Sequence, residues 1–392
     1  MPAAELNPAP PAPVPRVLSV QAAILGHRTY AQCLRDYFQS AIGCQVDSVW
    51  QNEEREWGAR LLVRGLTRTL PGGWIGARNA DGRRVRTELG DAYLARRLAV
   101  RHLARTPYQC LHFHTQVGAL LSTDLMRRVP TVITGDMTAA QGARAFGHAA
   151  WRWTHAPSIA LDRAAFRAAA QIAPWSEWAA QSVVSDYGVD PRRVQAINPG
   201  VDLSAFAWGA GKRRTTGLAN LLFVGNDFAR KGGEDVLDIF LHGLSEQAEL
   251  HLVTGADIGI SHPRVHVHRG VSAYSAEWRA LYQAADVFVL PTHFEAFGLV
   301  FMEAMAAGLP VVGSRINAIP EMVAHGETGL LVMPGDRHAL AQSVQSLVSD
   351  AALRRRMGAA GRAKAVSAFD AQANFGRLEA LFLSAAAQKR SV

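Results

Sequence analysis

The sequence is poor in cysteine and has no long apolar run. Its 392 residues include only three cysteines, at positions 33, 44 and 110, and no Cys-x-x-Cys pair. This scarcity excludes a disulfide framework and a thiolate zinc site, and it is typical of a reduced compartment. No apolar run approaches the roughly 18–20 residues that a membrane-spanning helix requires. We therefore expect a cytoplasmic protein, with at most a peripheral position at the inner face of a membrane.

The first 15 residues lack both a basic start and an apolar core, and six of them are proline. A secretory signal peptide needs those two features, so we expect a solvated Pro/Ala-rich tail instead. The whole chain is 49% hydrophobic and 19% charged. This balance excludes intrinsic disorder, and at about 150 residues per domain the length allows two or three domains.

Lysine occurs only four times, so arginine carries nearly all of the positive charge. The net charge of +8 is concentrated in residues 55–105, which hold 12 arginines and four acidic residues. Such a zone suits an anionic partner, either a lipid surface or a phosphate-bearing acceptor. Nucleic acid is not expected, because the sequence has no zinc-finger spacing and no RNP-like aromatic motif. The alternative is an ordinary packed helix, at about 91–108, with a solvated arginine face.

Short apolar runs alternate with helical patterns, which predicts parallel sheets covered by helices on both faces. The expected strands lie at 17–26, 110–113, 131–134 and 171–174, and then at 221–225, 249–255, 265–268, 286–291, 309–314 and 329–332. Helices are expected at 30–40, 115–128, 158–170, 176–188, 234–243, 276–284, 297–307, 318–324 and across 336–386.

The segment 197–214 interrupts this alternation with proline and glycine, and it is predicted to contain the linker. We therefore predict two Rossmann-like α/β domains facing each other across a cleft. Their expected boundaries are a tail at 1–15, a first domain at 16–200, a linker at 201–215, a second domain at 216–370, and a C-terminal helix at 371–392 that can cross back to the first domain.

The segment 221–240, LLFVGNDFARKGGEDVLDIF, runs from a strand into a glycine loop with Arg230 and Lys231. Two adjacent cations beside a permissive backbone suit a diphosphate. The loop has neither the Gly-Lys-Ser/Thr of a P-loop nor a Gly-x-Gly-x-x-Gly fingerprint, which disfavours ATP hydrolysis and NAD-dependent hydride transfer. The alternative is a helix start with solvated basic residues.

The segment 291–314, PTHFEAFGLVFMEAMAAGLPVVGS, carries two glutamates eight positions apart. A helix is expected to begin near Gly298, where its unpaired N–H groups can accept a phosphate. Glu295, just before that helix, would face whatever the phosphate carries. Glu303, among apolar neighbours, needs a hydrogen-bonding partner such as a hydroxyl pair. The alternative is a helix-terminal charge and an ordinary surface residue.

These motifs together resemble the GT-B glycosyltransferases of the large retaining family 4. The resemblance is carried by FVGNDFARKGG, by EAFGLVFMEAMAAGLPVVGS with its Glu295-x7-Glu303 spacing, and by LYQAADVFVLPT and AIPEMVAHGETGLLV. The frame from APWSEWAAQSVVSDYGVDPRRV to INPGVD at 173–202 also resembles that family. The resemblance is strongest from about 173 to 335 and specifies the fold and donor type rather than a particular sugar.

The resemblance implies roles for individual residues. Arg230 and Lys231 would bind the nucleotide diphosphate and neutralise the leaving group. Glu303 would hold the ribose hydroxyls, and Glu295 would contact sugar hydroxyls. The implied donor-binding residues are Gly26, Gly225, Arg230, Lys231, Glu295, Phe297, Gly298, Leu299 and Glu303. The implied catalytic residues are His114, Glu295, Arg230 and Lys231.

Two histidines, His112 and His114, end the run CLHFH. The family carries a histidine here, and His114 is the better match; near the transferred sugar it would position a hydroxyl or assist proton movement. A His-x-His metal pair is the alternative, but no third ligand is evident nearby, so no metal is expected. The similar alternation at 265–268 is interpreted as a strand edge.

Two segments depart from the family pattern. After the first strand, where the family usually has paired glycines, this chain offers only Gly26, followed by His27 and Arg28. Arg28 is a candidate substitute as a phosphate ligand, or the loop serves a different acceptor. The string at 134–141 lacks the family's more usual histidine, and its Asp136 is either an acceptor-contacting carboxylate or base, or a loop cap.

The implied activity is a retaining transfer of a sugar from a nucleotide-diphosphate sugar to a hydroxyl of a glycolipid, polysaccharide or other acceptor. The sequence has no Asp-x-Asp, the usual metal clamp of the other glycosyltransferase fold, so we expect neither a metal nor a cofactor. Attack from the leaving-group face, with a diphosphate oxygen taking the acceptor proton, fits these residues better than a covalent intermediate. The alternatives are a sugar phosphorylase or synthase with a small acceptor, and a non-catalytic sugar-nucleotide-binding protein.

Overall fold

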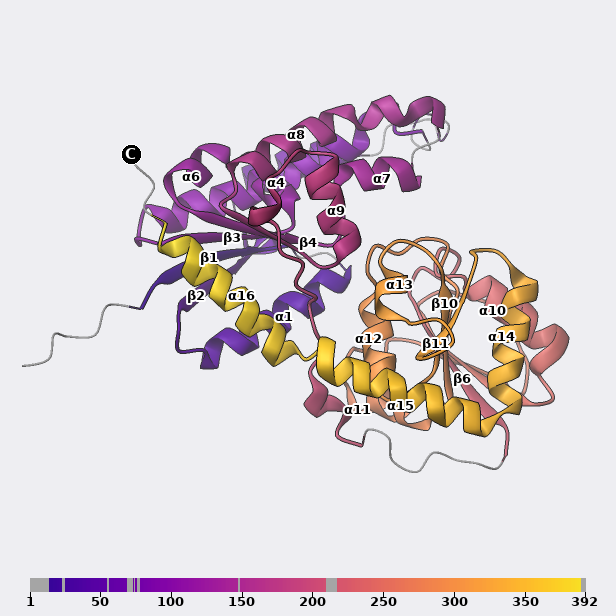
Figure 1. Ribbon diagram of the computed structural model, residues 1–392. Coiled ribbons are helices and arrows are strands. Elements are labelled where there is room, and N and C mark those ends of the chain that lie inside the picture. Colours follow the sequence, from indigo (N-terminus) through magenta and orange to yellow (C-terminus); the bar gives the residue numbers. More distant parts are fainter. Residues whose placement is uncertain are drawn as a thin grey trace, which may run out of the picture.

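The computed structural model describes residues 14–22, 25–54, 56–68, 73, 75, 78–146, 149–208 and 217–388. Within them the chain forms two parallel β-sheets, each covered by helices (Figure 1). This arrangement confirms the predicted fold class of two Rossmann-like α/β domains. Most of the predicted tail and the second half of the predicted linker lie outside the described residues.

The first sheet has the strand order β2-β1-β3-β4-β5, and the second has the order β11-β10-β9-β6-β7-β8. The strands of the first sheet are β1 Arg16–Gln21, β2 Gln45–Trp50, β3 Cys110–His114, β4 Thr131–Gly135 and β5 Gln171–Pro174. Those of the second are β6 Ala219–Val224, β7 Ala248–Val253, β8 Val265–His268, β9 Val287–Leu290, β10 Val311–Ser314 and β11 Gly329–Val332.

Helices connect the strands and cover both sheets. Those that precede the second sheet are α1 Leu25–Ser40, α2 Trp57–Thr67, α4 Arg83–Leu103, α5 Gln116–Ala119, α6 Thr123–Arg128, α7 Ala139–Phe146, α8 Ala156–Ala168 and α9 Glu177–Ser185. The others are α10 Gly233–Ile239, α11 Ala276–Ala284, α12 Leu299–Ala306, α13 Ile319–Met322, α14 Arg337–Ser349, α15 Ala351–Ala368 and α16 Ala371–Ala386.

The second domain matches the predicted elements closely. All six predicted strands are present, with ends within two residues of those expected. They are recognisable because central parallel strands are buried on both faces and therefore appear as continuous apolar runs. In the first domain, β2, α2 and α7 were not predicted, and the helix expected at 115–128 is two short helices, α5 and α6.

The last helix, α16, belongs to the first domain although the second domain precedes it in the chain. It packs against β3, β4, β5 and α1, and Figure 1 shows it lying along the first sheet. Phe382 on this helix is fully buried, and its ring lies 5.6 Å from that of Phe38 and 5.1 Å from that of His112. The chain therefore crosses between the domains twice.

The topology of each sheet decides where a site can form. The strand order turns around β1 in the first sheet and around β6 in the second. In open parallel sheets, the loops at the carboxyl ends of the strands diverge at such a point and leave a crevice for a ligand. The loops that follow β1, β3, β6 and β9 therefore frame the expected sites.

The arginine-rich zone at 55–105 is not a bare cationic surface. Glu54, which lies just outside that window and is buried, accepts hydrogen bonds from Arg97 and Arg101. Arg96 forms a bidentate ion pair with Asp124. Glu54 and Asp124, which both lie outside the window, therefore offset two of its eight net positive charges, and attraction to an anionic surface stays a prediction. Among the described residues, no helix combines the length and apolar character needed to cross a bilayer.

Replacing Phe382 by alanine should lower the free energy of unfolding by about 3–5 kcal/mol, because it removes a fully buried aromatic ring between α16 and the first sheet. Urea unfolding followed by tryptophan fluorescence measures the change. Val366→Ala, at a half-exposed position of α15, is the control and should cost less than about 1 kcal/mol. Equal effects of the two substitutions would show that α16 is not an integral part of the first domain.

Candidate active site

The second domain brings the two predicted donor motifs together. The loop after β6 carries Arg230 and Lys231, and the loop after the neighbouring strand β9 carries Glu295. The Lys231 amine forms an ion pair with the Glu295 carboxylate, and only 15% of either side chain is exposed. Arg230 donates from Nη1 to the carbonyl oxygen of Phe294 at 2.7 Å and pairs with Asp227 at 2.8 Å. The two loops therefore form one cationic wall.

The start of α12 lies at the edge of this wall. Gly298 caps the helix with φ +85°, and a Cβ there would lie 2.8 Å from the Phe301 ring and 3.0 Å from Glu295 Cγ. Only glycine satisfies both the backbone angle and the space. Phe297 is buried and Leu299 is half-buried. Gly225, at the end of β6, leaves room for Lys231, whose Cγ would lie 3.0 Å from an added Cβ.

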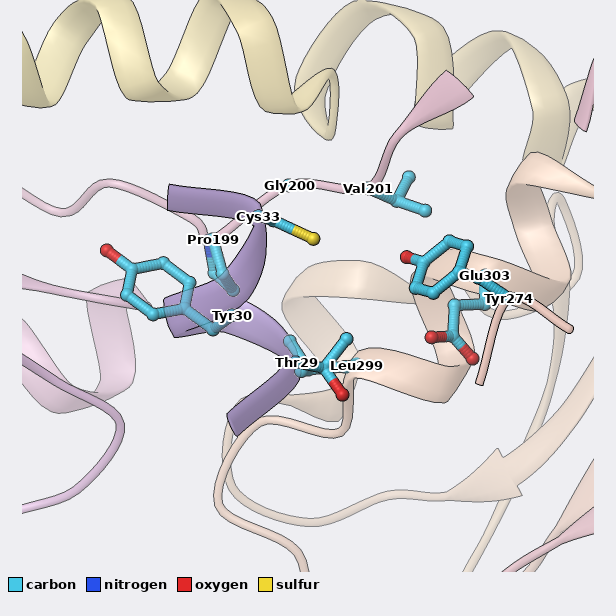
Figure 2. A pocket seen from close by; sticks show the side chains of 9 residues that line it. All are labelled: Thr29, Tyr30, Cys33, Pro199, Gly200, Val201, Tyr274, Leu299 and Glu303. Atoms are coloured by element: carbon cyan, nitrogen blue, oxygen red, sulfur yellow. The ribbon is translucent and has the colours of Figure 1, made fainter. Parts of the chain in front are cut away.

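Glu303 lies in the second turn of α12 and is almost fully buried. Burial raises the pKa of its carboxyl to about 7, although a hydrogen bond from the Tyr282 hydroxyl at 3.0 Å opposes this shift. Figure 2 shows the carboxylate beside Tyr274 in a small pocket between the two domains. Its free volume of about 10 Å³ is room for about one water molecule. The other walls of this pocket are Thr29, Tyr30, Cys33, Pro199, Gly200, Val201 and Leu299.

The first domain contributes a chain of three polar side chains opposite the cationic wall. His114, at the end of β3, has no exposed surface, and its Nε2 lies 3.0 Å from Nδ1 of His27 in the first turn of α1. His27 Nε2 lies 3.5 Å from a carboxylate oxygen of Asp136, just after β4. These positions are adjacent because β1, β3 and β4 are neighbours in the sheet.

His114 favours the neutral form of its ring, whereas His27 favours the charged form. Burial, reinforced by the charges of His27 and His112, lowers the pKa of His114 well below its usual value. Burial also acts to lower the pKa of His27, but the charge and hydrogen bond of Asp136 outweigh it and raise that pKa, with a smaller contribution from Glu295. A protonated His27 can donate to both Asp136 and His114.

Two contacts hold the domains together beside this site. The Trp175 ring, after β5, meets the Phe297 ring edge-on at 6.0 Å. The Glu321 carboxylate, on α13, accepts hydrogen bonds from the backbone N–H groups of Glu177 and Trp178 at 2.8 and 2.6 Å. A carboxylate at the N-terminus of α9 is favourable because it satisfies unpaired donors at the positive end of the helix dipole.

The structure thus brings most of the predicted site residues close together, and it adds His27 to them. His27 was not predicted as a site residue, although it lies between His114 and Asp136. The only signal in the sequence is its place after Gly26, in the loop that departs from the family pattern. Arg28 is exposed on α1, and Gly26 lies in the first turn of that helix. It stays a prediction that Arg28 contacts a phosphate and that His114 contacts a sugar.

His112 is part of the core rather than of the site. It is fully buried, with Nδ1 2.6 Å from the Ser19 hydroxyl and Nε2 3.0 Å from the Thr134 hydroxyl. Burial lowers its pKa to about 3, so the ring is neutral. Because both ring nitrogens are engaged by hydroxyl groups, His112 and His114 do not form a metal pair.

Two family models match the chain, one for each domain. Residues 28–205 match glycosyltransferase family 4, and residues 219–350 match glycosyl transferases group 1. A D-inositol 3-phosphate glycosyltransferase from Corynebacterium efficiens is 32% identical over 205 residues, which cover 45% of this chain and 47% of that protein. The match therefore spans about half the length of that relative.

Solved structures show the same fold. Sucrose-phosphate synthase from Thermosynechococcus elongatus superposes with a TM-score of 0.73 at 19% identity, covering 94% of this chain and 98% of that one. HepE from Anabaena, solved with UDP-glucose, superposes with a TM-score of 0.61 at 18% identity, covering 94% of this chain and 99% of that one. The chain belongs to the GT-B glycosyltransferases of the group 1, or family 4, type.

The raised pKa of Glu303 predicts a stability change with pH. Between about pH 4.5 and 7 the unfolded carboxyl ionises while the folded one stays protonated, so the wild type loses stability as the pH rises. Glu303→Gln does not titrate, and its free energy of unfolding relative to wild type should rise by roughly 3 kcal/mol across this window. Urea unfolding at pH 4.5 and pH 8 measures this, with the exposed Glu246→Gln as control. A constant difference would contradict the buried, protonated Glu303.

The His27–Asp136 contact predicts a shift that nuclear magnetic resonance can measure. Asp136→Asn removes the charge that raises the pKa of His27, so the titration midpoint of that ring should move to lower pH. The His27 signal is identified by its loss in His27→Gln. Asp186→Asn, which removes a carboxylate that pairs with Arg144, should leave the midpoint unchanged. The same midpoint in wild type and Asp136→Asn would show that the contact does not exist in solution.

Proposed function

We infer that this protein transfers a sugar from a nucleotide-diphosphate sugar to a hydroxyl group, with retention of the anomeric configuration and without a metal in the reaction. The observation that supports this most directly is the cationic wall of Arg230, Lys231 and the start of α12, placed opposite the His27–Asp136 pair. One wall suits a diphosphate, and the other suits a hydroxyl that must lose a proton.

The second domain would stabilise the leaving group. When the bond between the anomeric carbon and the diphosphate oxygen breaks, negative charge grows on that oxygen. Lys231, Arg230 and the positive end of the α12 dipole are fixed in place before the reaction, which is how preorganised charge lowers a barrier. A bound diphosphate competes with Glu295 for Lys231, and the released carboxylate would then contact sugar hydroxyls.

The first domain would hold the acceptor. In a same-face mechanism the acceptor oxygen attacks the anomeric carbon as the diphosphate leaves, and the acceptor proton passes to the leaving phosphate oxygen. His27 separates the buried His114 from the cleft, so His27 is the ring that a substrate meets first. Its partnership with Asp136 favours the charged form, which supports a role in holding an anionic group or orienting a hydroxyl.

Binding of a nucleotide sugar requires the domains to separate. The pocket at Glu303 has a free volume of about 10 Å³, far below the roughly 300–1,000 Å³ of small-molecule sites. Its walls come from both domains, with Thr29 and Tyr30 on one side and Tyr274 and Leu299 on the other (Figure 2). Separation of these walls would expose Glu303 to the ribose hydroxyls that the resemblance assigns to it.

The acceptor is proposed only as a class. The two named relatives, a D-inositol 3-phosphate glycosyltransferase and a sucrose-phosphate synthase, differ in what they glycosylate according to their names. A glycan or glycolipid hydroxyl remains the broad proposal for this chain. Association of residues 55–105 with an anionic membrane surface is part of that proposal. The ion pairs that Glu54 and Asp124 form with arginines of this zone reduce its positive charge.

A panel of UDP-, GDP-, ADP- and TDP-sugars tests the donor site. At 100-fold excess over Kd, a true donor should stabilise the wild type by about 2.7 kcal/mol in a thermal-shift assay. Lys231→Ala should lose this stabilisation because its partner for the diphosphate is gone. Arg192→Ala, an exposed arginine paired within its own turn, should keep it. A failure of every nucleotide sugar to stabilise the protein would overturn the proposal.

Release of nucleoside diphosphate in the presence of candidate acceptors tests catalysis. Lys231→Ala should lower kcat/KM by at least about 10²-fold, the usual effect of removing one preorganised charge. Analysis of the product's anomeric configuration tests retention. Donor binding without any turnover, across glycan, glycolipid and small sugar acceptors, would favour the non-catalytic sugar-nucleotide-binding alternative.

A further inference from the structure

A second cluster of histidines lies on the far edge of the second sheet, away from Lys231 and Glu295 in the sheet order. Strand β7 contributes Glu249 and His251, and the edge strand β8 contributes His266 and His268. The strands are parallel, and His251 pairs with His266 in register. Side chains two positions apart share one face of a strand, so all four side chains lie on the same face of the sheet.

The donor atoms are close enough to share one ion. Ligand atoms of Glu249, His251 and His266 all lie within 4.8 Å of one another. His266 Nε2 is 3.1 Å from a Glu249 carboxylate oxygen. In a tetrahedral site with Zn–N bonds of about 2.0–2.1 Å, neighbouring ligand atoms lie roughly 3.3 Å apart. One edge of such a tetrahedron is therefore present, and the ligand atoms at its other two edges lie no more than 4.8 Å apart.

His268 would be the hydrogen-bonding partner that orients a metal-binding histidine, which we call its outer support. His251 Nδ1 lies 3.1 Å from His268 Nε2, which leaves Nε2 of His251 for an ion. His268 Nδ1 in turn lies 3.8 Å from a carboxylate oxygen of Glu277 on α11. The hydrogen bond to His268 would fix the orientation and tautomer of the coordinating His251 ring. Glu277 lies too far from His268 for a hydrogen bond and contributes its charge alone.

The exposure of the cluster also suits a metal. The rings stack, with centroids 4.8 Å apart for His251 and His266. The His266 and Glu249 side chains are 38% and 36% exposed, so an ion can enter from solvent.

We propose that Glu249, His251 and His266 form a binding site for one divalent transition-metal ion, with His268 as its outer support. Two imidazoles and one carboxylate favour Zn²⁺, Co²⁺, Ni²⁺ or Cu²⁺, whereas Mg²⁺ and Ca²⁺ prefer oxygen ligands only. The site is separate from the cationic wall of Arg230 and Lys231, so the proposal that the transfer reaction needs no metal is unaffected.

The position of the site connects it to the pocket between the domains. The chain that leaves β8 at His268 runs through 269–275 to the cap of α11, and Tyr274 in this loop lines the pocket beside Glu303. His268 at the start of the loop and Glu277 just after its end are joined by the contact described above. An ion that fixes His251 and His266 would therefore restrain the loop that carries Tyr274.

Calorimetric titration of tag-free, chelator-treated protein with Zn²⁺ tests the site, and visible absorption with Co²⁺ reports its geometry. We expect one Zn²⁺ per chain, and a Kd at least tenfold weaker in His266→Gln, which changes a partly exposed position on an edge strand and should fold. His338→Gln, an exposed histidine on α14, is the matched control and should bind as the wild type does. No donor sugar is needed, so the result is independent of the proposed function.

Two outcomes would overturn the proposal. One is the absence of Zn²⁺ binding by the wild type. The other is equal affinity in wild type, His266→Gln and Glu249→Gln, which would place the ion elsewhere. Circular dichroism in chelator establishes that each variant is folded. Hydrogen exchange of residues 269–275 should slow when Zn²⁺ is added to wild type but not to His266→Gln, and unchanged exchange would overturn the restraint on the loop.

Discussion

The relative position of the two domains depends on a pair of chain crossings that hydrogen-bond to each other. The Val201 N–H donates to the Phe369 carbonyl at 2.7 Å, and the Ala371 N–H donates to the Val201 carbonyl at 3.1 Å. A side chain at position 200 would lie 2.6 Å from the Ala371 Cα, so only glycine allows the crossings to approach. Because α16 is anchored in the first domain, motion between the domains must bend this short ladder.

The site that this ladder positions is electrically balanced in each half. Lys231 is paired with Glu295 on one side, and His27 with Asp136 on the other. In the proposed reaction, a diphosphate that enters would meet cations already held in place and would displace the Glu295 carboxylate from Lys231. Burying an unpaired charge is costly, so the two ion pairs explain how these charged groups stay buried before a substrate binds.

The sequence predicts the second domain better than the first for a physical reason. Its strands β6, β9 and β10 are buried on both faces, so their apolar runs end at glycines and prolines that are visible in the sequence. The edge strand β2, QVDSVW, mixes polar and apolar residues because Asp47 pairs with Arg16 at the sheet edge. His27 could not be predicted as a site residue because its contacts form only when β1, β3 and β4 pair. The arginine-rich zone, taken from residue 55, did not include the negative charge of Glu54.

The two His-x-His strands show how position in a sheet decides what one pattern does. His112 and His114 lie on the central strand β3 under α16 and α1, where hydroxyl groups and another histidine engage the rings and solvent is excluded. His266 and His268 lie on the edge strand β8, where the register adds His251 and Glu249 beside them and one side stays open. Alternation alone places two imidazoles on one face. Burial and the neighbouring strand then determine whether the rings pack into a core beside the candidate active site or stay open to solvent, where the proposed ion would bind.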